Sequence, residues 1–243
     1  MDSDFFLPLA AIVGARACDL REHEAWEVNC QSIKDVVSFL LKSECRIVFP
    51  NTNSGYQSGL SEPCTESSPL NPVSYYGTTK INAEKVVLDL NGISFRFATL
   101  FGMSPRMRMD LLVNDFVYRA MRDRYVVLYQ AKFRRNYLHV RDAASVFLWA
   151  IDHFDEMKGK PYNIGLPDAN LTKRELCERI KQRVTDFYFT EAEVGEDPDR
   201  RDYTVSNERI LATGWRPKYS LDDGIRELVK GYEILKGEKY GNV

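Results

Sequence analysis

The stretch "CRIVFPNTNSG" (residues 45–55) decides the fold, because its apolar run ends abruptly in polar residues and glycine. Such a run predicts a short buried strand that ends at a loop. A second apolar run, "ISFRFATLFG" (93–102), follows a helical pattern from Tyr75 to Leu90. Upstream, apolar residues recur at helical spacing from His23 to Lys42, and "DFFLPLAAIVGA" (4–15) predicts a buried strand running into a loop. This strand–helix–strand–helix–strand series predicts an α/β fold with a parallel sheet.

Residues after Gly102 form shorter and more mixed elements. Thr172 and Glu175 have the spacing of a capping box at the start of a helix, and a final helix is predicted from near Leu221. Residues 102–243 are therefore expected to form mainly a smaller lobe, with 134–156 returning to the sheet that residues 1–101 build. The other predicted elements are helices at 109–123 and 141–154 and strands at 125–130, 134–140, 161–166 and 187–194.

The overall composition excludes several classes of protein. The chain has 243 residues, of which 44% are hydrophobic and 28% charged, and its formal net charge is −2. These values are typical of a folded globular protein. The net charge shows no excess of Lys and Arg of the kind that binds nucleic acid. No apolar run is long enough for a membrane span, and "MDSDFF" at the N-terminus lacks the pattern of a secretory signal. Five cysteines without C-x-x-C spacing favour reduced thiols in the cytoplasm and argue against disulfides and a metal site.

Tyr76 and Lys80 in "SYYGTTK" (74–80) are candidates for proton transfer. Residues four apart on a helix share one face, so the two side chains can share a site. A free tyrosine has a pKa near 10, and a nearby ammonium stabilises the phenolate and lowers that pKa. The pair could equally be two surface residues of an ordinary helix.

Thr52 stands at the end of the predicted strand in "VFPNTNSGY" (48–56), shortly before the helix that carries Tyr76. Ligands of open parallel sheets bind beyond the carboxyl ends of the strands. A hydroxyl there could hydrogen-bond the same substrate oxygen that Tyr76 deprotonates. Ordinary turn chemistry explains the same residue types, because Asn, Thr and Ser often follow strands.

Several of these segments occur together in one known family. The chain resembles the NAD-dependent epimerase/dehydratase family, the extended short-chain dehydrogenase/reductases that act on nucleotide sugars. The resemblance implies an incomplete Rossmann-type doubly wound parallel sheet with a smaller mixed α/β substrate-binding lobe. The matching segments, in family order, are "LAA" (9–11), "WEVN" (26–29), "VFPNTNSGY", "YGTTK" (76–80), "FRFATLFG" (95–102), "RRNYLHVRDAA" (134–144) and "GEDPDRRDYTVSN" (195–207).

The resemblance assigns roles by motif position. Tyr76 would be the catalytic base, Lys80 would lower its pKa and bond the nicotinamide ribose, and Thr52 would bond the sugar hydroxyl. Tyr76 and Lys80 would thus also contact NAD, with NADP as an alternative, and Asn29 would steady the adjoining strand. The remaining cofactor-lining positions are Leu9, Ala10 and Ala11. The substrate-binding positions are Asn53, Ser54, Thr99, Asn114, Arg135, Arg200 and Arg201.

One departure from the family pattern reduces the number of reactions that the chain could catalyse. Members that dehydrate sugars have an Asp-Glu pair directly after the catalytic Thr, whereas this chain has Asn53 and Ser54, which exchange no proton near neutral pH. Dehydration is therefore not expected. The reactions that remain are oxidation of a sugar hydroxyl, reduction of a ketone and epimerisation. "FGMSPRMRMDLLVNDF" (101–116) most resembles bacterial enzymes that oxidise C4 of GDP-linked manno-heptose, which favours a GDP-sugar. The resemblance also implies a homodimer, formed by helices 23–42 and 75–90.

The glycine-rich loop that binds a dinucleotide pyrophosphate is not found in the sequence. Gly14 follows what resembles the family's fourth strand, so about 60–75 residues of two βαβ units would precede it. We expect an enzyme whose first units are missing from this sequence, and very weak NAD binding by the 243 residues alone. The alternative is a non-catalytic truncated paralogue that binds nucleotide sugar or only dimerises.

Overall fold

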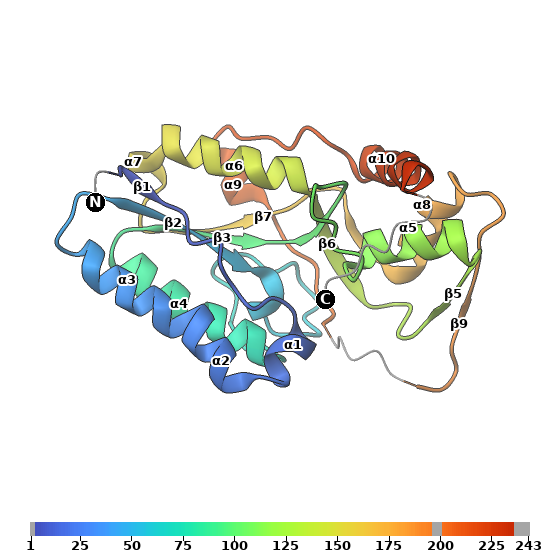
Figure 1. Cartoon of the computed structure of the whole chain (residues 1–243), viewed down its shortest axis with the longest axis horizontal. Coiled ribbons are helices and arrows are strands. Elements are labelled where there is room, and N and C mark those ends of the chain that lie inside the picture. The colour runs from blue at the N-terminus through green and yellow to red at the C-terminus, as the bar shows by residue number, and fades with distance from the viewer. Residues whose placement is uncertain (1–2, 196–200, 236–243) are drawn as a thin grey trace.

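The largest sheet has four parallel strands in a computed structural model that describes residues 3–195 and 201–235. Their spatial order is β1 (Phe5–Phe6), β2 (Arg46–Thr52), β3 (Ile93–Phe97) and β7 (Pro161–Ile164). Figure 1 shows this sheet between two layers of helices. The predicted α/β fold with a parallel sheet is confirmed.

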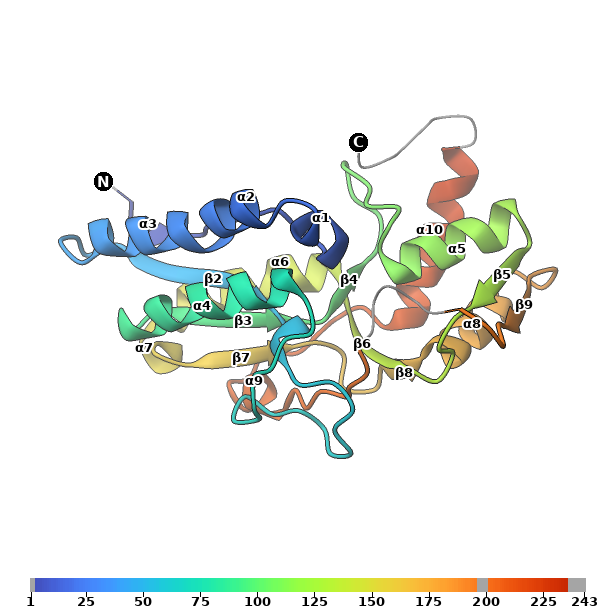
Figure 2. The same cartoon turned by 90° about the horizontal axis from the view of Figure 1, so that it is seen from below.

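Helices cover both faces of the sheet because side chains of β2 alternate between them. Ile47 and Phe49 pack against one layer, whereas Val48 belongs to the core under the other. Figure 2 shows the same layers from below. The first layer comprises α1 (Ala15–Asp19), α2 (Glu22–Trp26), the π-helical turn η1 (Glu27–Gln31), α3 (Ser32–Leu40) and α4 (Tyr75–Asp89); the second comprises α6 (Val140–Asp152), α7 (Phe154–Met157) and α9 (Glu208–Ala212).

The second lobe has its own buried cluster, which includes Val117, Leu176 and Ile225 from three different helices. The predicted capping box of Thr172 and Glu175 is confirmed. The lobe's helices are α5 (Leu112–Arg122), α8 (Lys173–Lys181) and α10 (Leu221–Ile234). Its strands are β4 (Thr99–Phe101), β6 (Arg134–His139) and β8 (Asn170–Thr172) in one sheet and β5 (Tyr125–Leu128) and β9 (Tyr188–Glu191) in another.

The structure corrects two predicted strands. Residues 4–15 do not form a buried strand: β1 has two half-buried residues, and Pro8, which cannot donate to a sheet, follows soon after it. Residues 93–102 form two strands in different sheets, because the chain turns at Ala98. The Ala98 N–H donates to the Ile164 carbonyl at 2.9 Å, after which β4 pairs with β6.

Segment 134–156 divides between the two lobes. Its helix α6 packs on the large sheet through Ala143, Val146 and Ala150, whereas its strand β6 pairs with β4 and β8. The fourth strand of the large sheet is β7, beyond this segment. Within the described ranges, no helix is long and apolar enough to span a membrane, and no cluster of three or more His, Cys, Asp or Glu is placed to hold a metal ion.

Candidate active site

Thr52 ends β2, and a single turn of 3₁₀ helix, η2 (Asn53–Gly55), follows it directly. The Thr52 Oγ1 accepts from the Ser54 backbone N–H at 3.1 Å and donates to the Ser54 Oγ at 2.9 Å. Both side chains are buried, and the local bonds fix the hydroxyl of Thr52 at the carboxyl end of the strand. Asn53 is 2% exposed, and neither the oxygen nor the nitrogen of its side-chain amide has a hydrogen-bond partner among the described residues.

Helix α4 begins against this turn. Ser74 caps the helix by accepting from the Gly77 N–H at 3.2 Å. A Cβ at Gly77 would lie 2.6 Å from the Ser54 carbonyl oxygen and 2.7 Å from the Pro72 Cβ. Glycine therefore permits the close approach that brings Tyr76 beside Thr52 and Ser54.

We expect Gly77→Ala to destabilise the protein by about 1–3 kcal/mol, because overpacking outweighs the better helix propensity of alanine. Urea unfolding measures the change, and Lys85→Ala, at an exposed position of the same helix, is the control. A Gly77→Ala protein as stable as the wild type would contradict the close approach.

One open cavity of about 340 Å³ contains most of the predicted site residues. The sheet lobe supplies Thr52, Tyr76 and Lys80, and the second lobe supplies Arg135. The other predicted residues that line it are Leu9, Ala11, Asn53, Ser54, Thr99 and Arg201. Ala10 does not line it, and Arg200 lies outside the described residues.

The Tyr76 hydroxyl does not have the lowered pKa that the sequence predicted. Burial of this hydroxyl raises the pKa of Tyr76 to about 12, with a smaller effect in the same direction from Cys18. The positive charges of Arg201 and Arg108 lower this pKa. The cations that favour the phenolate are thus these two arginines, which line the same cavity.

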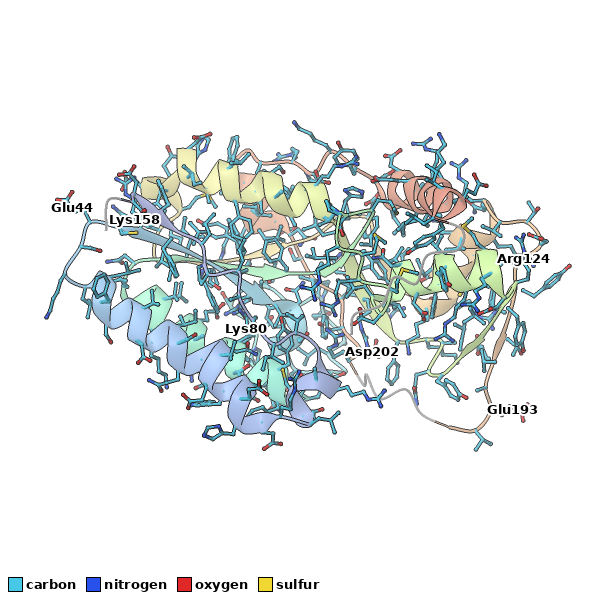
Figure 3. All side chains as sticks on the ribbon, viewed as in Figure 1. Glu44, Lys80, Arg124, Lys158, Glu193 and Asp202 are labelled. Atoms are coloured by element: carbon cyan, nitrogen blue, oxygen red, sulfur yellow. The ribbon has the colours of Figure 1, made fainter. Side chains whose placement is uncertain are left out.

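Lys80 is buried, and its Nζ lies 4.0 Å from the centroid of the Phe49 ring. Burial lowers the pKa of Lys80 to about 7, against the smaller opposing effects of Cys18 and Glu84. Among the residues described, no carboxylate forms an ion pair with it. Figure 3 labels Lys80 in the sheet lobe and Asp202 near the junction of the lobes.

Asp202 connects the two arginine segments of the cavity. Its Oδ1 accepts from the Arg134 N–H at 2.8 Å, next to Arg135. Its own N–H donates to the Ser58 Oγ at 2.8 Å, and Arg201 Nη1 donates to the Ser54 Oγ at 2.5 Å. These contacts hold Arg135 and Arg201 at one cavity, where guanidinium groups suit phosphate oxygens.

Asn114 does not line the cavity. Its Oδ1 accepts from the Gly102 N–H at 3.1 Å, and its Nδ2 donates to the Arg108 carbonyl at 2.9 Å. The oxygen and the nitrogen of the Asn114 side-chain amide therefore both hold the loop that brings Arg108 to the cavity. The predicted site did not include Asn51, Asn136 and Tyr203, which also line the cavity. The signal in the sequence for Asn51 and Asn136 was a polar residue within a predicted strand.

Asn29 fixes the segment that follows β1. Its Oδ1 accepts from the Ile12 N–H at 2.8 Å, and its Nδ2 donates to the Ile12 carbonyl at 2.9 Å. The same nitrogen donates to the Thr79 Oγ1 on α4 at 3.3 Å. The predicted steadying role thus acts on a loop, Leu9 to Gly14, that forms one wall of the cavity.

Comparison with known proteins gives one family match: residues 1–165 match the model of the NAD dependent epimerase/dehydratase family. Mouse dTDP-D-glucose 4,6-dehydratase is 26% identical over 205 residues, which cover 77% of this chain and 55% of that protein. The chain thus spans about half the length of the first curated relatives that it matches.

Solved structures share the fold. The UDP-glucose 4-epimerase of Thermus thermophilus, in complex with NAD, superposes with a TM-score of 0.80 at 22% identity, covering 95% of this chain and 78% of that one. RMD from Pseudomonas aeruginosa, complexed with NADPH, gives a TM-score of 0.82 at 17% identity, covering 96% and 82%. These likenesses agree with the parallel sheet and the second lobe described above.

Proposed function

The chain belongs to the NAD dependent epimerase/dehydratase family, and on this basis we propose that it serves hydride transfer between a carbon of a nucleotide-diphosphate sugar, C4 in our proposal, and NAD or NADP. The observation that carries the proposal is the convergence of Thr52, Tyr76 and Lys80 on one cavity with Arg135 and Arg201. A cavity inside a purely structural core would be lined by apolar side chains, whereas these five polar and charged side chains line one cavity.

The chain's own residues would manage the proton of the sugar hydroxyl. Thr52 Oγ1 would orient that hydroxyl, and the Tyr76 oxygen would take its proton during oxidation and return one during reduction. Tyr76 can act as a base only when its hydroxyl is ionised, and Arg201, Arg108 and a charged Lys80 would favour that state.

The residues present fit the nicotinamide half of the cofactor. Lys80 presents a buried ammonium with no ion pair among the described residues, beside a wall formed by Leu9, Ala11 and Gly14. Lys80 would bond the nicotinamide ribose there. Bound NAD would supply the hydride acceptor, and bound NADH the donor. The 243 residues contain no G-x-x-G-x-x-G sequence for the pyrophosphate.

Arg135 and Arg201 would bind the diphosphate of the substrate, and Asn53 and Ser54 would bond sugar hydroxyls. The Asn53 amide supports this role, because it has no hydrogen-bond partner within the described part of the chain, and a buried polar group without a partner is uncommon. Neither side chain supplies the acid–base pair that loss of water requires. We therefore propose a 4-dehydrogenase or epimerase reaction, with a GDP-linked sugar such as manno-heptose as the favoured substrate.

The proposal also includes a homodimer through α2, α3 and α4. Phe39 and Leu41, at the end of α3, are 58% and 68% exposed, which a partner surface would cover. Light scattering on the purified chain measures its mass in solution, and a monomer at all concentrations would contradict the dimer.

The function is tested by incubating the protein with GDP-, UDP- and dTDP-linked sugars and with NAD or NADP in large excess, because we expect these 243 residues to bind the cofactor weakly. We expect NMR of a GDP-sugar product to show one of two changes at C4: oxidation with an equal amount of reduced cofactor, or inversion without net reduction of the cofactor. A 4-keto-6-deoxy product would contradict the exclusion of dehydration. Nucleotide-sugar binding without turnover at any pH would contradict the enzymatic function.

A further inference from the structure

A buried carboxylate lies one helical turn beyond Lys80 on α4. Glu84 is 2% exposed, and its oxygens accept hydrogen bonds from two strands of the sheet. Asn51 Nδ2 and Ser94 Oγ each donate to Oε2 at 2.6 Å, and Arg96 Nη2 donates to Oε1 at 2.6 Å. Glu84 therefore ties the helix that carries Tyr76 to β2 and β3.

Asn51 extends this connection to Thr52. Its Nδ2 donates to Glu84, while its Oδ1 accepts from the Thr52 N–H at 2.8 Å. Asn51 is 4% exposed, so water does not replace these bonds. Two consecutive hydrogen bonds through one side chain thus join α4 to the backbone of the residue that would orient the substrate.

The charge of Glu84 determines which way the Asn51 amide faces. An ionised carboxylate only accepts hydrogen bonds, so Asn51 must turn its NH₂ group toward Glu84 and its oxygen toward Thr52. Arg96 keeps the carboxylate in place, and its Nη1 donates to the Tyr56 hydroxyl, which donates to Asn163 Oδ1. The position of Glu84 is thereby fixed from β3 and β7 as well.

We propose that Glu84 and Asn51 are positioning residues that hold Thr52 in register with Tyr76. The inference rests on the proposed function, because it assigns the pair a purpose in that reaction. Asn51 lines the cavity beside Thr52, whereas Glu84 does not. The effect of both residues would pass through the Thr52 backbone, to which Asn51 is hydrogen-bonded. A small displacement of a group that orients a reacting atom can lower the rate about 100-fold.

The first experiment compares Asn51→Ala with Ser94→Ala. Both remove a 2.6 Å hydrogen bond to the same oxygen of Glu84 and leave the Glu84–Arg96 ion pair, but only Asn51 also contacts Thr52. We expect Asn51→Ala to shift the Thr52 amide proton upfield in NMR spectra and to speed its hydrogen exchange. It should lower kcat about 100-fold with an unchanged KM for the nucleotide sugar, whereas Ser94→Ala should change neither signal nor kcat.

The second experiment exchanges the two functional groups. In Asn51→Asp with Glu84→Gln, the new carboxylate at position 51 can accept from both the glutamine amide and the Thr52 N–H, and Arg96 still has a carboxylate nearby. We expect the double variant to recover the Thr52 amide signal and most of kcat, while each single substitution loses both. If Asn51 and Glu84 only stabilised the fold, exchanging their carboxylate and amide groups would not restore the Thr52 amide signal and kcat.

Equal effects of Asn51→Ala and Ser94→Ala on Thr52 would overturn the proposal, and so would a double variant no better than the singles. The amide measurements need neither substrate nor turnover. A wild-type protein without turnover would therefore contradict the proposed function alone, while the Thr52 signal would still decide the positioning role.

Discussion

Tyr76→Phe should reduce turnover of the nucleotide sugar by about 10²–10⁴-fold, the usual contribution of a general acid–base group. The substitution removes one hydroxyl and keeps the ring that packs at the start of α4. Tyr76 lines the cavity beside Thr52 and Lys80, so loss of its oxygen removes the group that would carry the substrate proton. Steady-state kinetics measure kcat, and calorimetry measures nucleotide-sugar binding, which should remain unchanged.

Tyr75→Phe is the matched control for this prediction. It makes the same chemical change one residue earlier on α4, at a side chain that does not line the cavity. We expect its turnover to equal that of the wild type. Near-normal kcat in Tyr76→Phe, or equal losses in the two variants, would refute the assignment of Tyr76.

Lys80 should make stability rise with pH above neutrality. Its pKa is about 7 in the folded chain, against 10.5 for a free side chain. Below pH 7 the ammonium is charged in both the folded and unfolded states, so its burial destabilises the fold in full. Between about 7 and 10.5 only the unfolded state holds the proton, so raising the pH progressively removes this cost.

Lys80→Met should therefore be more stable than the wild type at pH 6, by roughly 3–5 kcal/mol, with the difference shrinking toward pH 10. Urea unfolding across this range measures it, and Lys85→Met, at an exposed lysine of the same helix, corrects for the loss of an ammonium from α4. A difference that stays constant across this pH range would show that burial does not lower the pKa of Lys80.

The parallel sheet could be predicted because its signals are local. The apolar run of β2 ends in polar residues, and α4 has a clear helical pattern, so type and order of these elements followed from the sequence. The division between β3 and β4 could not be predicted. Ala98 carries no breaking signal, and the turn arises from pairing with Ile164 and β6, which are distant in the chain.

The candidate site shows the same distinction. Tyr76 and Lys80 are four residues apart on one helix, and that spacing alone brings them together. The raised pKa of Tyr76 and the lowered pKa of Lys80 depend on burial by several segments. The hydrogen bond that Asn51 donates to Glu84 joins residues 33 positions apart, so no local sequence pattern predicts it. For Asn114 the motif position predicted a substrate contact, but its side-chain amide hydrogen-bonds the backbone of Gly102 and Arg108 instead.

The chain passes between the two lobes several times, and this affects how the molecule must unfold. After β4 enters the second lobe, α6 and β7 return to the large sheet, β8 leaves again, and α9 returns once more. A cut near Gly102 would strip one face of the sheet of its helices and remove an entire strand. Neither half would retain a complete core, so we expect the lobes to melt together in a single cooperative transition rather than as separable modules.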